Sequence, residues 1–277
     1  MYRKDSIIIE EWLKSSDKAL LVTGARQIGK TWLIREEISK SGYRKFEVNF
    51  IDQPDLIDYL NVKMSADEFL VKLKMIMPED CKPQETVVFF DEIQMVDGFQ
   101  KVIDSLFLLD NVDIYVTGSN AYLLSGEIAT LLTGRYVEIK LFPFSFKEYL
   151  KAMPSDMSIE SAYREYIEKS SFPYVLQIKD DREMIREYLS GLYNTIVLKD
   201  VVSRRKITDV MMLESVVRFL ADNIGNLSVV KRISDTMTSL GRKITSHTVE
   251  NYISALTDSY IFYSVPRYDA KGKQLLK

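Results

Sequence analysis

The 277-residue chain is poor in cysteine and histidine and has no long apolar run, and each scarcity excludes a class of protein. Cys81 is the only cysteine, so no internal disulfide can form and a reducing compartment fits best. His247 is the only histidine, which argues against a zinc site because such sites draw on several His and Cys ligands. No uninterrupted apolar segment approaches the roughly 20 residues of a membrane-spanning helix.

Neither charge sign dominates, because the chain has 37 Lys and Arg residues and 40 Asp and Glu residues, which gives a net charge of −3. This balance argues against a protein that coats nucleic acid indiscriminately, although a local basic face is compatible with it. The apolar run 7–9 meets two glutamates at once, too early for a signal peptide. We therefore expect a cytoplasmic protein of two or three structural units without a membrane partner.

The most informative motif is residues 24–31, GARQIGKT, which follow a short apolar run and precede amphipathic sequence. In this strand–loop–helix context, GxxxxGK[ST] lets backbone amides curl around phosphate oxygens. Lys30 reaches the outer phosphates, and the Thr31 hydroxyl ligates Mg²⁺. The predicted nucleotide-binding residues are Gly24, Ala25, Arg26, Gln27, Ile28, Gly29, Lys30, Thr31 and Trp32.

A second candidate site is a pair of carboxylates, Asp91 and Glu92, which directly follow the apolar run of residues 87–90. Asp91 is expected beside the Mg²⁺. Thr31 and Asp91 are the two predicted metal-binding residues. Glu92 would orient and deprotonate the attacking water. A strand that ends in two solvated acids gives the same pattern, but the phosphate loop earlier in the chain favours the catalytic interpretation.

Two further residues are candidates for catalysis together with Lys30 and Glu92. Ser119 and Asn120 end the next strand, and we choose Asn120 as the side chain that contacts the γ-phosphate or the water; a helix cap explains it equally well. Arg135 opens the fifth strand, where it can stabilise developing phosphoryl charge in its own subunit or across a subunit boundary of a homo-oligomer. Pairing with a neighbouring acid is the alternative for Arg135.

Alternation of strand-like and helix-like segments predicts an α/β fold, the three-layer core of a P-loop NTPase with a parallel sheet. The expected strands cover residues 19–23, 45–50, 86–90, 113–117 and 136–141. The expected helices between them cover residues 31–41, 66–77 and 98–109.

From residue 145 onward the periodicity is helical, which predicts an all-α lid over residues 144–225 after an ATPase core of residues 1–143. The expected helices cover residues 146–153, 159–170, 182–199, 210–224 and 229–240. Residues 226–277 follow the order helix, turn, helix (245–259), strand (260–265), which is typical of a winged helix. The chain ends inside the expected second wing strand, so we expect a truncated wing.

The last domain is also the basic one, with eight cationic and four acidic side chains and a local charge of about +4. This balance makes DNA a candidate partner. The cations are Lys231, Arg232, Arg242, Lys243, Arg267, Lys271, Lys273 and Lys277.

The sequence resembles prokaryotic AAA-type ATPases that carry a DUF4143 C-terminal domain, over nearly its whole length. The resemblance is carried by GARQIGKT, VVFFDEIQ, TGSNAYLLSGEIATLLTGRYVEIKLFPFSFKEYL, YNTIVLKDVVSRRKI and HTVENYISALTDSYIFYSVPRYDAKGKQLL. It implies an AAA-like core, a helical lid and a winged-helix region, followed in full-length relatives by a nuclease-like domain that this chain does not include.

The same resemblance implies which residues serve the nucleotide. It assigns phosphate and Mg²⁺ contacts to Gly24, Gly29, Lys30, Thr31, Asp91 and Glu92. It also places Asn120 at the sensor position and makes Arg135 a candidate arginine finger.

The function expected from these observations is that of a Mg²⁺-dependent ATPase. Its nucleotide state would move the lid and the winged helix on DNA or on a partner protein. ATP is preferred to GTP because of the resemblance, and no NKxD-like guanine-reading segment is present. The alternatives are a nucleotide-gated DNA-binding regulator, or a defence or signalling sensor with little turnover.

Overall fold

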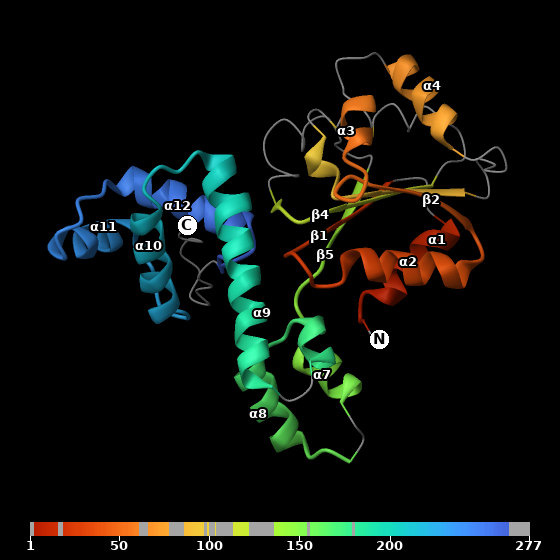
Figure 1. Ribbon diagram of the computed structural model, residues 1–277. Coiled ribbons are helices and arrows are strands. Elements are labelled where there is room, and N and C mark those ends of the chain that lie inside the picture. Colours follow the sequence, from red (N-terminus) through yellow and green to blue (C-terminus); the bar gives the residue numbers. More distant parts are fainter. Residues whose placement is uncertain are drawn as a thin grey trace, which may run out of the picture. The chain divides into compact units, whose positions relative to one another are not determined.

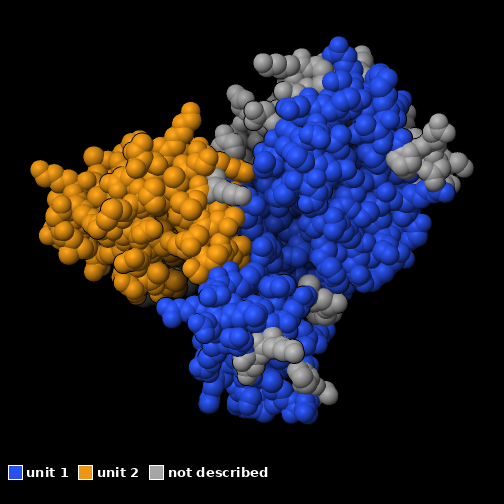
Figure 2. Space-filling model, in the orientation of Figure 1, with its two compact units in different colours: residues 1–188 blue, residues 189–277 orange. Residues whose placement is uncertain are grey.

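The computed structural model describes residues 3–15, 19–60, 66–77, 86–96, 99, 103, 113–121, 136–153, 156–178 and 181–265. The chain forms two compact units, residues 1–188 and 189–277 (Figure 2). The three-domain division expected from the sequence stays a prediction. None of the described helices has both the length and the apolar character that crossing a bilayer requires.

The first unit is built on a parallel sheet with the strand order β2-β3-β4-β1-β5 (Figure 1). Each strand lies within one residue of its predicted ends, so the α/β prediction is confirmed. β1 and β3 are buried at every residue, which explains why they read as continuous apolar runs. The bounds are β1 Ala19–Thr23, β2 Arg44–Asn49, β3 Thr86–Asp91, β4 Asp113–Gly118 and β5 Tyr136–Lys140.

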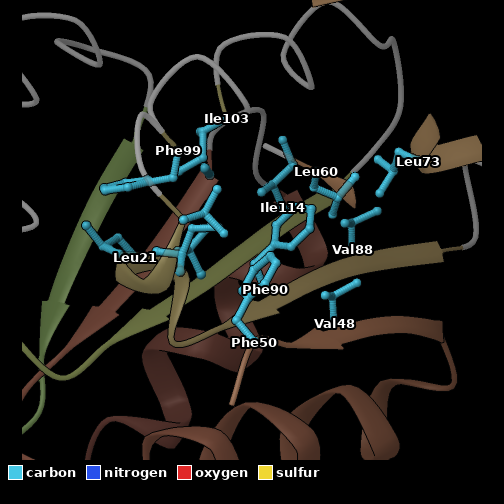
Figure 3. Close-up of a cluster of buried hydrophobic side chains, with 14 of the residues drawn as sticks. Leu21, Val48, Phe50, Leu60, Leu73, Val88, Phe90, Phe99, Ile103 and Ile114 are labelled. Atoms are coloured by element: carbon cyan, nitrogen blue, oxygen red, sulfur yellow. The ribbon is translucent and has the colours of Figure 1, made fainter. Parts of the chain in front are cut away.

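Helices cover both faces of the sheet, which makes the three expected layers (Figure 1). α1 (Ser6–Ser15) and α2 (Lys30–Ser41) cover one face, and α3 (Asp55–Tyr59) and α4 (Ala66–Ile76) cover the other. Under α3 and α4, alternate strand residues form the main core, because side chains one residue apart point to opposite faces. Figure 3 shows this cluster, which includes Leu21, Val48, Val88, Phe90, Ile114, Leu60, Leu73, Phe99 and Ile103.

Beyond β5 the first unit is helical, as predicted. α7 (Phe146–Ala152) begins with a capping box in which Ser145 and Glu148 each accept a hydrogen bond from the other residue's backbone N–H. α8 (Ile159–Lys169) follows, then a 3₁₀ segment (Pro173–Gln177) and the start of α9 (Arg182–Thr195).

The second unit is entirely helical among the residues that the structure describes. α9 continues into a π-helical segment (Ile196–Ser203), where the sequence predicted regular α-helix to residue 199. α10 (Val210–Asp222), α11 (Val230–Ser239) and α12 (Ser246–Asp258) complete the unit. Its core includes Val201, Leu213, Val216 and Leu256.

The strand predicted over residues 260–265 does not form, so this part of the winged-helix prediction is wrong. Tyr260 adopts a left-handed turn conformation with φ 60°, and Ile261 and Phe262 pack against the helical core of the second unit instead of pairing as a strand. Packing of these apolar side chains against helices therefore accounts for the apolar character of the segment that was predicted as a strand. The expected second wing strand lies outside the described residues.

Candidate nucleotide-binding site

The loop between β1 and α2 needs glycine at both glycine positions of the GxxxxGK[ST] motif. Gly24 has φ 142°, and a Cβ on it would lie only 2.3 Å from the Leu141 carbonyl oxygen. Gly29 precedes α2 in the left-handed region, with φ 91°. Other residues rarely adopt these angles, so both glycines are required by the path of the backbone.

Lys30 begins α2 and its side chain turns back over the loop. Its Nζ donates hydrogen bonds to the carbonyl oxygens of Gly24 (3.0 Å) and Ala25 (2.8 Å). The same Nζ lies 4.0 Å from Glu92 Oε1, and only 4% of the Lys30 side chain is exposed. The ammonium is thus held between the loop and the end of β3.

Asp91, the last residue of β3, accepts hydrogen bonds from three side chains. The Thr31 hydroxyl donates to both carboxylate oxygens, at 2.8 and 3.0 Å. Asn49 Nδ2 donates at 2.9 Å, and the Thr117 hydroxyl donates as well. Burial raises the pKa of Asp91 above its ordinary value, and the Thr117 and Thr31 hydroxyls offset only part of that rise.

Glu92 adopts the left-handed conformation with φ 57°, an uncommon and costly geometry for a residue with a side chain. Its Oε2 accepts hydrogen bonds from the Ser119 hydroxyl (2.8 Å) and from Gln94 Nε2. Burial acts to raise the pKa of Glu92. The positive charge of Lys30 and these hydrogen bonds together lower the pKa by more than burial raises it, so the net pKa is below its ordinary value. Glu92 is therefore held as a carboxylate.

The order of the strands explains why these residues meet. β4 lies between β1 and β3, and carboxyl ends of parallel strands lie at the same edge of a sheet. β4 therefore places Thr117 and Ser119 between the phosphate loop and the two acids.

Three residues of the site were missed from the sequence: Asn49, Gln94 and Thr117. Asn49 and Thr117 belong to strands β2 and β4, and Gln94 follows β3 in a short 3₁₀ turn (Ile93–Met95). Their position at strand ends was the available signal, but their contacts depend on the register of neighbouring strands.

The remaining predicted residues have different surroundings. Arg26 is half-buried, and its charge contributes to the lowered pKa of Glu92. Gln27 is exposed, with φ 59°, and its Oε1 accepts a hydrogen bond of 2.6 Å from the Tyr188 hydroxyl. Asn120 is buried at the tip of β4. Arg135 lies outside the described residues.

The donor set suits Mg²⁺. Among the described residues no group of three or more His, Cys, Asp or Glu side chains could hold a metal ion. Mg²⁺ does not need such a group, because it binds through one or two protein oxygens, substrate phosphates and waters. The Thr31 hydroxyl in the first turn of α2 and the Asp91 carboxylate at the end of β3 are 2.8 Å apart and offer hard oxygen ligands.

Comparisons with known proteins agree with this geometry. Residues 16–150 match the family model described as an AAA domain. A Walker-type ATPase of Pyrococcus abyssi has a similar fold, with a TM-score of 0.59 over 93% of this chain and 89% of that one, at 16% identity. The family match and the fold support a P-loop ATPase.

The same comparisons correct the prediction for the C-terminal part. Residues 160–277 match a domain of unknown function, DUF8612, and not the expected DUF4143. An uncharacterized protein of Haemophilus influenzae is 38% identical over 95% of this chain, and one of Methanocaldococcus jannaschii is 28% identical over 94%. The chain spans 66% and 59% of the lengths of these two relatives.

The basic residues of the second unit differ in their surroundings. Arg242 Nη1 donates to the Met211 carbonyl (3.0 Å) and to the Ser215 hydroxyl (2.6 Å), so this arginine holds α10. Lys231, Arg232 and Lys243 are exposed. Arg267, Lys271, Lys273 and Lys277 lie outside the described residues. His247 is exposed, with Nε2 3.3 Å from Asn251 Nδ2.

Proposed function

We propose that the chain binds ATP with Mg²⁺ and hydrolyses it at the carboxyl edge of the sheet. The observation that carries the proposal is the single network in which Lys30, Thr31, Asp91, Glu92 and Ser119 are joined at the ends of β1, β3 and β4. A phosphate loop alone would serve binding. A buried carboxylate beside it supplies the second group that hydrolysis needs.

For the phosphate loop and the two acids, the contacts described above support the proposed roles. Backbone amides of residues 24–31 and the Lys30 ammonium hold the β- and γ-phosphates. Thr31 and Asp91 would hold Mg²⁺, which supplies positive charge to the phosphate oxygens. Glu92 orients the attacking water and accepts its proton. Asn120 and Arg135 keep their predicted roles, as the sensor of the γ-phosphate and as the arginine finger of the same or a neighbouring subunit.

We further propose that nucleotide state moves the helical segments, which act on DNA or on a partner protein. Support comes from the hydrogen bond between Tyr188 and Gln27, because Tyr188 belongs to α9 and Gln27 to the phosphate loop. α9 continues without a break into the π-helical segment of the second unit.

The test of hydrolysis compares wild type with Lys30→Ala and Glu92→Gln. Lys30→Ala should abolish binding and turnover, whereas Glu92→Gln should keep binding and lose at least about a hundredfold in kcat, the usual contribution of a general base. Lys14→Ala and Glu10→Gln are matched controls, because that exposed pair lies on α1 with side chains 67% and 58% exposed. Turnover that survives both site substitutions would refute the proposal.

The exposed cations favour a second candidate, a nucleotide-gated DNA-binding regulator. Lys231 and Arg232 lie at the start of α11, and Lys243 lies in the turn before α12. The triple alanine variant of these residues should lose salt-dependent DNA affinity, since each phosphate contact contributes through counterion release. Arg242 is left unchanged because it packs α10. DNA affinity absent at low salt would exclude this candidate.

A further inference from the structure

Arg3 is a buried cation that lies against the phosphate loop. Only 1% of the residue is exposed, and its Nη2 donates hydrogen bonds to the carbonyl oxygens of Ile28 and Phe142, the second at 3.1 Å. Its Cζ lies 4.7 Å from the centroid of the Phe144 ring. One guanidinium thus joins the loop residue before Gly29 to the segment that follows β5.

The ion-pair partner of Arg3 is Glu148 of α7. Arg3 Nη1 lies 3.6 Å from Glu148 Oε1, which also accepts the Lys4 backbone N–H at 3.1 Å. The other oxygen, Oε2, accepts the Ser145 backbone N–H (2.9 Å) and its hydroxyl (2.7 Å). The start of α7 and the N-terminal segment are therefore fixed on the same pair of charges.

Stability alone gives little reason for this arrangement. A buried ion pair is often no more stable than apolar side chains of the same volume, because both charges lose their hydration. Arg3 Nε is buried and has no hydrogen-bond partner among the described residues, which adds to that cost. Retaining a charged group here makes sense if its two carbonyl contacts serve another purpose.

The contact with Ile28 fixes the orientation of a peptide group. In a planar trans peptide, the Ile28 carbonyl and the Gly29 N–H point in opposite directions. A carbonyl held by Arg3 cannot turn toward a phosphate, which it would repel. The Gly29 N–H is held on the opposite side of the plane, and such loop amides are the groups that bind phosphate oxygens.

We propose that Arg3 is a positioning residue of the nucleotide site: by holding the Ile28 carbonyl it presets the Ile28–Gly29 peptide for phosphate binding. This inference rests on the proposed function, since it assumes that the loop binds a nucleotide. Contacts with the Phe142 carbonyl and with Glu148 also hold the guanidinium, so its hold on the Ile28 carbonyl does not depend on bound nucleotide.

The experiment compares wild type with Arg3→Met and Arg3→Lys. Arg3→Met keeps the apolar volume and removes both donors, whereas Arg3→Lys keeps the charge but reaches fewer acceptors. Arg182→Met is the control, because the Arg182 side chain is 83% exposed and its guanidinium pairs with Glu168 at the surface. Binding of Mg–ATP and Mg–ADP is measured by calorimetry, at a temperature where each variant is folded.

Arg3→Met should weaken ATP and ADP by the same factor, about tenfold or more, because both nucleotides carry the β-phosphate that the loop binds. KM should rise while kcat changes little, since the loop holds ground state and transition state alike. The affinities of Arg3→Lys should lie between those of Arg3→Met and wild type. The affinities of Arg182→Met should match those of wild type. Wild-type affinity in a folded Arg3→Met or Arg3→Lys variant overturns the proposal, and so does failure of both variants to fold.

Hydrogen exchange separates this proposal from the proposed function. Without nucleotide, the peptide covering residues 24–31 should exchange faster in Arg3→Met than in wild type. Unchanged exchange in that peptide refutes the role of Arg3. Absence of ATP binding by the wild type refutes the proposed function and leaves the exchange comparison to judge Arg3 alone.

Discussion

Thr31 and Asp91 stand 60 positions apart in the sequence, and the Thr31 hydroxyl donates to both oxygens of the Asp91 carboxylate, at 2.8 and 3.0 Å. Thr31 is the second residue of α2, and Asp91 is the last residue of β3. The bond joins the two groups that the motifs assign to Mg²⁺ and fixes their separation within the reach of a single ion.

Thr31→Val should therefore weaken Mg–ATP binding more than binding of ATP in EDTA. The substitution keeps the shape of the side chain and removes the hydroxyl, so the gain in affinity on adding Mg²⁺ should fall about tenfold, equivalent to roughly 1.4 kcal/mol. Thr31→Ser should retain the gain. Calorimetry with and without Mg²⁺ measures it, and equal losses under both conditions contradict the assignment.

Gly24→Ala should destabilise the first unit and abolish nucleotide binding. Its Cβ would meet the Leu141 carbonyl at 2.3 Å, and φ 142° disfavours a side chain, so we expect a loss of about 2–4 kcal/mol. Gly191→Ala is the matched control, because Gly191 lies within α9 with no atom within 4 Å of a new Cβ. That control should stabilise by about 0.5–1 kcal/mol. Thermal unfolding curves of both variants measure these changes in stability.

Ser119→Ala should lower kcat about tenfold with little change in KM. The hydroxyl donates to Glu92 Oε2 at 2.8 Å, so its loss frees the carboxylate to leave the orientation needed for water activation. Asn120→Ala tests the neighbouring sensor prediction in the same steady-state assay. A larger loss in Asn120→Ala favours Asn120 as the γ-phosphate contact, and wild-type rates in Ser119→Ala contradict the role of the hydroxyl.

The stabilisation that the Glu148 carboxylate gives to the first unit should be lost in acid. Burial acts to raise the pKa of Glu148, but hydrogen bonds from Ser145 and Lys4 and the charge of Arg3 lower it below its unfolded value. A depressed carboxylate pKa stabilises above the unfolded pKa of about 4.3, and this contribution is lost as pH falls through the folded pKa.

The difference in unfolding free energy between wild type and Glu148→Gln should therefore be larger at pH 7 than at pH 3. Urea titrations at both values measure it. Glu160→Gln, at an exposed position of α8, provides the control. A difference that does not change with pH would show that the capping contacts of Glu148, and not its charge, carry its stability.

Tyr188→Phe should reduce communication between the phosphate loop and α9. Burial raises the pKa of Tyr188 to about 12, so its hydroxyl remains a donor to Gln27 across the physiological range. The ring also packs on Tyr174, with centroids 5.0 Å apart, and phenylalanine keeps that contact. Nucleotide-induced changes in hydrogen exchange over residues 189–265 should shrink in Tyr188→Phe. Tyr163→Phe, whose ring packs on Phe146, should behave as wild type.

The sheet was predictable because its signals are local. Buried parallel strands must be continuously apolar, and the phosphate loop is a contiguous motif, so both can be read along the chain. Asn49 and Thr117 could not be assigned to Asp91 in this way, because that contact depends on strand order. Arg3 gave no signal at all, since an arginine near an N-terminus is usually a solvated side chain.

The error at residues 260–265 has a related cause. Alternation of apolar and polar residues predicts a strand only where a neighbouring strand can pair with it. Ile261 and Phe262 found their apolar environment against helices, so the same residues satisfied burial without a ladder. Local pattern fixes which side chains are buried more firmly than it fixes the backbone that buries them.

The left-handed backbone at Glu92 has a consequence for engineering. Glycine or asparagine at that position would relieve the torsional cost, so a library screened for heat resistance alone should drift away from glutamate there. Such variants should gain heat resistance and lose the proposed hydrolysis, so position 92 is one where the proposed catalytic role and stability favour different residues.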